Sequence, residues 1–176
     1  MAERLKVAEL GDPVLRSHTL PITDIHSPAI QTLIDNLIHT ATETNGVGIA
    51  APQVSQNLQL FIVASRPTLR YLDAPVMPPT PMINPQILAK SEERVLGWEG
   101  CLSVPGLRGQ VWRAKEIEVK YTDRQGEIQQ KVFTDFVARI VQHEFDHISG
   151  KVFLDRVEST TDLMSEAEYH SRIVCG

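Results

Sequence analysis

The sequence predicts an α+β fold: a single compact domain, residues 1–176, in which antiparallel or mixed β-sheets pack around a central helix carrying an HExxH pattern. A chain of 176 residues is long enough to bury one substantial core. Two segments with helical periodicity lie far apart in the chain, and strand-like segments separate them. Strands that follow one another without intervening helices favour α+β over an alternating parallel sheet.

The first helix is expected near residues 28–44. Ser27 and Pro28 match the N-cap and the first helical position, because serine accepts a backbone hydrogen bond there and proline has no N–H to lose. Asn45 and Gly46 then end the helix. The apolar residues that recur at helical spacing between these signals are Ile30, Leu33, Ile34, Leu37, Ile38 and Ala41.

Several strands are expected in the middle of the chain. Residues 58–64 are apolar and partly β-branched, which indicates a buried strand, and the prolines of 67–81 indicate a surface loop before a second short strand at 82–88. Residues 117–121 alternate between apolar and polar side chains, and a turn at 123–126 leads into residues 128–133. This pattern predicts a hairpin.

A second helix is expected from about Asp135 to Ser149, closed by Gly150. At about 100° per residue, His143 and His147 lie on the edge of an apolar arc and Glu144 lies near its middle. The arc consists of Phe133, Phe136, Val137, Ile140, Val141 and Ile148. The opposite face is predicted to be solvated and holds Asp135, Arg139, Gln142, Asp146 and Ser149. A short third helix is expected in the tail, at residues 160–169.

The residues from His143 to His147 form an HExxH pattern, which indicates a metal site. Histidines at positions i and i+4 lie one above the other on a helix, so both imidazoles can reach one ion. The pattern also occurs by chance, but the predicted burial of Glu144 strengthens it. A buried carboxylate must be paired or coupled to a metal.

A third ligand is needed to complete such a site. The third histidine of metzincin proteases is absent, because Phe153 stands at that position. A downstream glutamate, as in thermolysin-like enzymes, leaves Glu166 and Glu168 open. The strongest candidate is Cys101, within residues 97–106, a glycine-rich stretch expected to be a loop where backbone approaches a ligand closely. A thiolate binds soft or borderline divalent metals well.

Composition argues against several classes of partner. The net charge of −5 at pH 7 opposes nucleic acid or an anionic membrane as the main partner. The sequence has no apolar run long enough to span a bilayer and no apolar signal-peptide segment at its start, so the expected compartment is the cytoplasm. With two cysteines, Cys101 and Cys175, a disulfide scaffold is not expected.

Three blocks of the sequence resemble the peptide deformylase family. They are Gly46-Val-Gly-Ile-Ala-Ala-Pro-Gln53, Glu99-Gly-Cys-Leu-Ser103 and Gln142-His-Glu-Phe-Asp-His147. The blocks occur in the family's order, and the resemblance covers nearly all of the chain. It implies a metal-dependent hydrolase that removes the N-formyl group from the N-terminal formylmethionine of newly made polypeptides and releases formate.

The resemblance also implies roles for single residues. One divalent ion, typically Fe2+ with Zn2+, Ni2+ or Co2+ as substitutes, is bound by Cys101, His143 and His147. Glu144 accepts the proton of the attacking water and delivers a proton to the leaving amine. The side-chain amide of Gln53 and the backbone N–H of Leu102 stabilise the oxyanion.

The resemblance places the substrate peptide like an extra strand along the backbone of Gly48 and Gly100. The methionine side chain is expected in an apolar pocket near Val47, Phe136 and Ile140, and Gly46 is expected among the substrate-binding residues. Two alternatives stay open for Arg108, which either contacts substrate backbone or is a solvated surface residue. Glu99 and Arg113 are expected to pair and to hold the Cys101 segment.

Two rival functions remain at this point. A metallopeptidase that cuts internal bonds needs a downstream ligand, and a non-enzymatic module with a structural zinc needs a fourth ligand, for which Cys175 is the candidate. Some bacterial relatives dock on the ribosome through a longer basic C-terminal helix. Here the tail is acidic, so ribosome docking has weak support. The acidic residues are Glu158, Asp162, Glu166 and Glu168, against Arg172 as a fixed positive charge.

Overall fold

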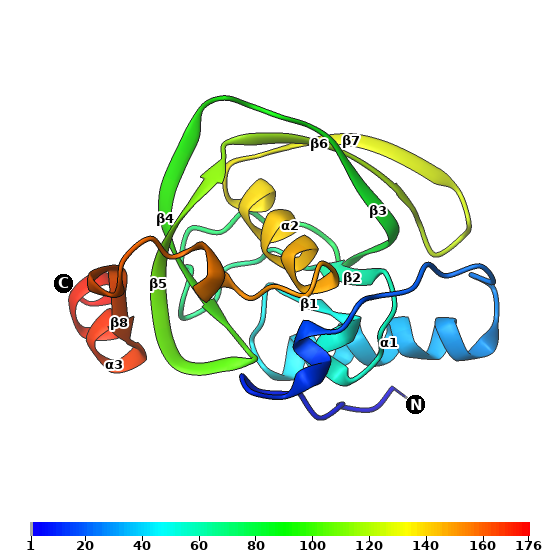
Figure 1. Cartoon of the computed structure of the whole chain (residues 1–176), viewed down its shortest axis with the longest axis horizontal. Coiled ribbons are helices and arrows are strands. Elements are labelled where there is room, and N and C mark those ends of the chain that lie inside the picture. The colour runs from blue at the N-terminus through cyan, green and yellow to red at the C-terminus, as the bar shows by residue number, and fades with distance from the viewer. Residues whose placement is uncertain (1) are drawn as a thin grey trace.

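A computed structural model describes residues 2–176 and confirms an α+β domain with antiparallel sheets around a central helix (Figure 1). The strands are β1 (Gly48–Ala50), β2 (Leu60–Val63), β3 (Thr80–Lys90), β4 (Arg94–Cys101), β5 (Val104–Ala114), β6 (Glu116–Thr122), β7 (Ile128–Thr134) and β8 (Leu163–Ser165). Five of them form one sheet in the order β1-β2-β3-β6-β7. The other three form a second sheet in the order β4-β5-β8.

The helices begin and end close to where the sequence predicts. Helix α1 spans Pro28–Glu43, and the Ser27 hydroxyl accepts a hydrogen bond from the backbone N–H of Ile30. Helix α2 spans Asp135–Ile148, and Gly150 follows it with a φ of +71°, a conformation that glycine adopts without strain. The shorter elements are η1 (Pro13–Arg16), η2 (Ala51–Val54), η3 (Phe153–Arg156), η4 (Thr160–Asp162), α3 (Glu166–Tyr169) and a short π-helix, η5 (His170–Val174).

Helix α2 lies at the centre of the molecule, with strands of both sheets around it (Figure 1). Its fully buried Ala138 and Val141 belong to one core cluster with Phe61, Val63 and Met82 of the larger sheet. Helix α1 packs a second cluster against the other face of β1 and β2. The five-stranded sheet therefore holds α2 rigidly, and burial of this apolar surface is the main favourable term for doing so.

The glycine-rich stretch 97–106 is not the loop that the sequence predicts. It comprises the end of β4, a tight turn and the start of β5, and these two strands were not anticipated. Glycine disfavours strands in general, but here a Cβ on Gly97 would meet the guanidinium of Arg139. A Cβ on Gly100 would likewise meet the guanidinium of Arg108. The glycines leave room for arginines that pack against the strands.

The predicted solvated face of α2 is wrong for three of its residues. Arg139, Gln142 and Asp146 are buried, whereas Asp135 and Ser149 are exposed as expected. The helix is enclosed by protein on more sides than its apolar arc indicates. The three polar side chains can be buried because hydrogen-bond partners from the protein replace water. The expected helix at 160–169 is also mostly wrong, because η4 and β8 precede the short α3.

Candidate metal centre and substrate pocket

Three potential ligands from two elements converge in the structure. Cys101 ends β4, and His143 and His147 lie on successive turns of α2. A sulfur and two ring nitrogens from these residues all lie within 4.8 Å of one another, and the distance from Cys101 Sγ to His147 Nε2 is 3.2 Å. One thiolate and two imidazoles at this spacing fit a divalent ion with an open coordination position.

The electrostatic environment favours the thiolate form of Cys101, which is the form that binds metals. Burial opposes ionisation of the Cys101 thiol, but His147 and His143 outweigh it and hold the pKa of the thiol well below its usual range. Cys175, the candidate fourth ligand of a structural site, is exposed near His170 and is not part of this group. Within the described chain the site therefore has three protein ligands.

Glu99 sets the orientation of one ligand. Its carboxylate lies 2.9 Å from Nδ1 of His143, which leaves Nε2 of that ring for a metal ion. Arg113 donates two hydrogen bonds to the same carboxylate, at 2.8 and 2.9 Å, so the expected Glu99–Arg113 pair is confirmed. Although burial opposes ionisation, Arg113 and His143 hold the pKa of Glu99 well below its usual range.

Glu144 is buried beside the histidines and is not fully satisfied. Within residues 2–176, two buried side-chain polar atoms have no hydrogen-bond partner, and they are Glu144 Oε2 and His147 Nδ1. Burial raises the pKa of Glu144 to about 7, although the charges of His143 and His147 oppose the rise. Gly48 gives this carboxylate its space, because a Cβ at that position would overlap it.

Gln53 is held by both ends of its side-chain amide. Its Oε1 accepts a hydrogen bond of 2.9 Å from the backbone N–H of Ala50, which directs Nε2 toward the turn between β4 and β5. Nε2 donates to the Ser103 hydroxyl at 3.1 Å and lies 3.5 Å from Cys101 Sγ. A neutral N–H donor is thus fixed beside the metal ligands.

A narrow pocket of about 50 Å³ opens onto this centre. It gathers every residue that the sequence assigns to catalysis or substrate binding. These are Gly46, Val47, Gly48, Gln53, Gly100, Leu102, Arg108, Phe136, Ile140 and Glu144. Cys101 and His143 also line it, whereas His147 is buried at 1% exposure and does not.

Comparison with known proteins gives a family. Residues 4–162 match the family model described as polypeptide deformylase. The chain belongs to the peptide deformylase family. It is 56% identical over 171 residues to peptide deformylase 2 of Nostoc sp., covering 97% of this chain and 96% of that one.

Solved structures of deformylases share the fold. The class I type b peptide deformylase of Acinetobacter baumannii with bound Met-Ala-Ser has 48% identity and a TM-score of 0.87, covering 89% of this chain and all of that one. The Synechococcus elongatus peptide deformylase in complex with actinonin has 36% identity and a TM-score of 0.80, covering 92% of this chain and 84% of that one. Membership makes the chain a metal-dependent hydrolase of the class that removes N-formyl groups from nascent peptides.

The deformylase pocket has one wall that the sequence did not predict. Arg70 and Tyr71, from the proline-rich loop, line the pocket, and the Tyr71 ring lies 4.8 Å from that of Phe136. The loop is tied to the C-terminal segment, because Glu166 accepts hydrogen bonds from both Arg70 and Arg108. The sequence signal was the length of the loop, which is unusual for a simple connection between strands.

Arg108 is not a solvated surface residue, since it is 2% exposed. Its guanidinium donates to Glu166 at 2.9 and 3.0 Å and to the Tyr71 hydroxyl at 2.9 Å. It also lies over the ring of Tyr169, 5.0 Å from the centroid. These contacts place Arg108 between the pocket and the tail.

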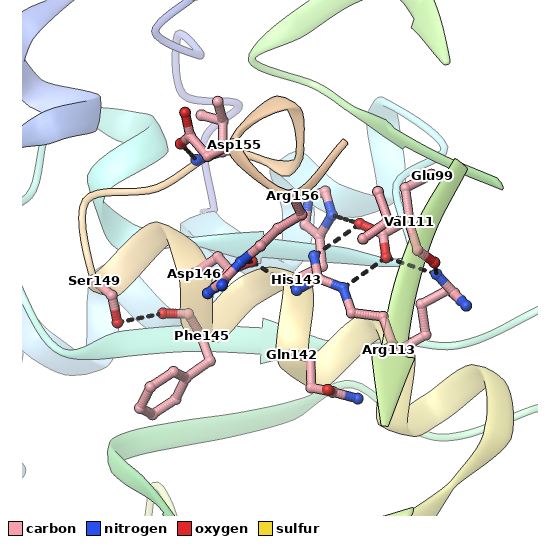
Figure 2. Close-up of polar contacts among 12 residues, drawn as sticks. Glu99, Val111, Arg113, Gln142, His143, Phe145, Asp146, Ser149, Asp155 and Arg156 are labelled. Atoms are coloured by element: carbon pink, nitrogen blue, oxygen red, sulfur yellow. Dashed lines mark hydrogen bonds and ion pairs between the residues drawn. The ribbon is translucent and has the colours of Figure 1, made fainter. Parts of the chain in front are cut away.

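The expected Glu99–Arg113 pair belongs to a larger, mostly buried ion-pair network around α2, whose other members were not expected (Figure 2). Arg113 joins Glu99 to Asp146, at 2.7 Å from the latter, and Arg156 donates two further hydrogen bonds to Asp146. Arg139 donates to Glu99 and to backbone carbonyls of β4 and β5. Apart from the Glu99–Arg113 pair, no sequence pattern marks these partners, because they come from four separate segments.

Proposed function

We propose that Glu144 moves the protons while Cys101, His143 and His147 hold the metal ion as the N-formyl amide is hydrolysed. The observation that carries this assignment is the buried, partly unpartnered carboxylate of Glu144, in a pocket shared with the ligand group. Buried polar groups are usually satisfied, so an exception beside three ligands points to chemistry.

A divalent ion at this centre supplies a Lewis acid that activates a water molecule and polarises the formyl oxygen. We propose Fe2+ as the native ion, with Zn2+, Ni2+ or Co2+ able to replace it. The mixed thiolate and imidazole donor set supports an ion from this borderline group.

Glu144 accepts a proton from the attacking water and returns one to the leaving amine, so that formate and a free amino terminus result. Its pKa of about 7 suits both halves of this transfer, because a group that titrates near the working pH donates and accepts equally well. Nε2 of Gln53 and the backbone N–H of Leu102 donate to the oxygen on which negative charge develops. The fixed orientation of the Gln53 amide supports its part.

The peptide lies extended between the edges of two sheets. Strand β1, with Gly48, is at the edge of the larger sheet, and β4, with Gly100, is at the edge of the smaller one. Both glycines line the pocket, as does Gly46. Backbone hydrogen bonds to such edges bind a strand without reading its sequence, which suits a substrate that varies beyond its first residue.

Specificity for methionine comes from the apolar part of the pocket. Val47, Phe136 and Ile140 line it and pack on the core, so they offer a firm apolar wall. Methionine is flexible enough to fill a narrow, irregular space. Arg108 contacts the substrate further along, from its position between the pocket and Glu166.

Residues 1–176 act as one catalytic domain in the cytoplasm, on nascent N-formylmethionyl chains, without a direct nucleic-acid or membrane partner. No helix within residues 2–176 is long and apolar enough to cross a membrane. Ribosome docking through the tail has weak support, because Glu166 is already engaged by Arg70 and Arg108.

The test is to purify the protein without oxygen, measure its metal content and assay formate release from formyl-Met and formyl-Gly peptides. We expect about one divalent ion per chain. We also expect kcat/KM to be higher for formyl-Met than for formyl-Gly, by a factor that corresponds to roughly 2–4 kcal/mol of transition-state binding from apolar burial. Exposure to air should inactivate the iron form faster than a nickel form, because the thiolate and ferrous ion are open to oxidation. Equal kcat/KM values for the two peptides would contradict the methionine pocket. Equal rates of inactivation in air for the iron and nickel forms would contradict the iron assignment.

A further inference from the structure

A second cavity, of about 450 Å³, opens on the other face of α2. It is lined by Gln142, Phe145 and Asp146 of α2 and by Ser149, which directly follows the helix. Figure 2 shows these four side chains. Its walls come from the end of β3, the start of β4, the end of β5 and the segment after α2. The cationic residues of these walls are Lys90, Arg94, Arg113, Lys151 and Arg156, and we call this cavity the basic cleft.

The charge of the basic cleft is not balanced by the protein. Among the residues that the structure describes, Asp146 is the only carboxylate that lines it, and Arg113 and Arg156 already share that group. Within residues 2–176, Lys90, Arg94 and Lys151 make no ion pair. Three uncompensated cations thus surround one concavity in a chain whose net charge is −5.

The environment of Lys90 agrees with an excess of positive charge. Partial burial lowers the pKa of its amine, and the charges of Arg156, Arg113 and Lys151 lower it further, against the opposing effect of Asp146. An anion in the cleft would relieve this repulsion. The arrangement therefore resembles a site that is complete only with an anion present.

We propose that the basic cleft binds a small phosphate-bearing molecule. A phosphate group has several acceptor oxygens, which match the ammonium groups of two lysines and the fork of an arginine. The size of the cavity is within the range of small-molecule sites. A small anion is favoured over an RNA backbone because the cations lie in a concavity and the net charge of the chain repels an extended polyanion.

Trp112 lines the same cleft and is 39% exposed. The guanidinium of Arg94 lies 5.9 Å from the centre of its ring. The indole offers a flat surface that suits the base of a nucleotide, and its fluorescence reports on the cleft. Free phosphate and a nucleotide share the chemistry of the site, and the two are separated by using both as probes.

The experiment titrates the nickel-loaded chain, in a Trp98→Phe background, with inorganic phosphate, AMP and a short single-stranded RNA. Binding is followed by calorimetry and by Trp112 fluorescence. The test variant is Lys90→Gln/Lys151→Gln, and the matched control is Lys120→Gln/Lys131→Gln, which removes two exposed lysines of β6 and β7. We expect phosphate or AMP to bind the parent and control, and to bind the test variant at least about ten-fold more weakly.

Tighter binding of AMP than of phosphate would identify a nucleotide as the ligand, and equal binding would identify the phosphate group alone. Formate release should be the same in the parent, the test variant and the control, because none of the four substituted lysines lines the deformylase pocket. If phosphate bound at the nickel ion instead of in the basic cleft, its affinity would be the same for the test variant and the control. Equal affinities in those two variants, no saturable binding of either small probe, or binding of RNA alone would each overturn the proposal.

Discussion

The two faces of α2 both bury polar side chains, but the protein satisfies them differently. On one face, Gln142 bonds the backbone of Ala114 and Ala138, and Asp146 accepts hydrogen bonds from two arginines. On the other face, Glu144 and His147 each keep one buried atom without a partner in the described chain. The satisfied polar groups hold the helix in place, and the unsatisfied ones lie at the centre where we propose that the reaction takes place.

The two carboxylates show the same contrast in their pKa values. Burial opposes ionisation of both, and for Glu144 it prevails and raises the pKa to about 7. For Asp146, the hydrogen bonds and charges of Arg156 and Arg113 outweigh burial and lower the pKa. Two residues apart on one helix, one carboxyl group has a pKa raised toward neutral pH and the other a pKa lowered so that it remains charged.

The largest effect is expected from Glu144→Gln, which keeps the shape but cannot take a proton. Formate release should fall by roughly 10²–10⁴-fold, while about one metal ion per chain and the melting temperature are kept. The measurement is metal content, turnover and thermal unfolding on one sample. Near-normal turnover with full metal would remove Glu144 from the mechanism, and loss of the metal would make it a ligand or a support of one.

Unlike Glu144→Gln, which should keep the melting temperature, Asp146→Ala should destabilise the fold. It leaves Arg113, which is 5% exposed, with Glu99 as its remaining carboxylate partner. Breaking a buried pair costs on the order of 3 kcal/mol, which corresponds to a melting temperature lower by roughly 6–12 °C for a chain of this size. Thermal unfolding of the metal-loaded protein measures it. An unchanged melting temperature would show that Asp146 is not structural, and the contrast between the faces would fail.

The sequence predicted the burial of the proposed reacting face well and the burial of the structural face poorly. The HExxH spacing and the apolar arc placed His143, His147 and Glu144 correctly, because helical geometry alone determines which side chains share a face. The same rule put Asp146 and Arg139 in solvent. Charged residues are buried only when partners are supplied, and Arg113, Arg156 and Glu99 come from distant positions that no local pattern reveals.

The strands beside the site were missed for a related reason. Gly97 and Gly100 lower strand propensity locally, and the arginines that fill the space above them become neighbours only in the folded chain. Sequence patterns therefore located the chemistry and the two long helices. Among the ion pairs that brace them, Glu99–Arg113 was expected from the family resemblance, and the others required the structure.

Gly48→Ala tests how closely the reacting face is packed. The added Cβ would overlap the Glu144 carboxylate and displace it, and a displacement of about 1 Å costs on the order of 10²-fold in rate. Metal content should be unchanged. Combining Gly48→Ala with Glu144→Gln should cost little beyond Glu144→Gln alone, because both changes act on one proton transfer. Additive losses would mean that Gly48 acts through the substrate instead.

The smallest effect is expected where a buried cation meets a half-exposed carboxylate. Burial raises the pKa of Glu166, but Arg108 and Arg70 outweigh it, so the folded-state pKa lies below the usual value. A carboxyl group with a depressed pKa stabilises the fold above its unfolded-state pKa of about 4.3, and this stabilisation is lost as the pH falls through the folded-state value. Solvent screens the pair, because the Glu166 side chain is 37% exposed.

Glu166→Gln should therefore lower stability at pH 7 by less than about 1 kcal/mol, and the difference from the parent should disappear in acid. Glu168→Gln is the matched control and should have no measurable effect, since Glu168 lies on the same short helix as Glu166 and pairs with exposed Arg172 of η5. Thermal unfolding of the three proteins from pH 7 downward measures both. A difference that stays constant with pH would show that Glu166 acts through its shape and hydrogen bonds. The contrast between satisfied and unsatisfied carboxylates would then not extend from α2 to the tail.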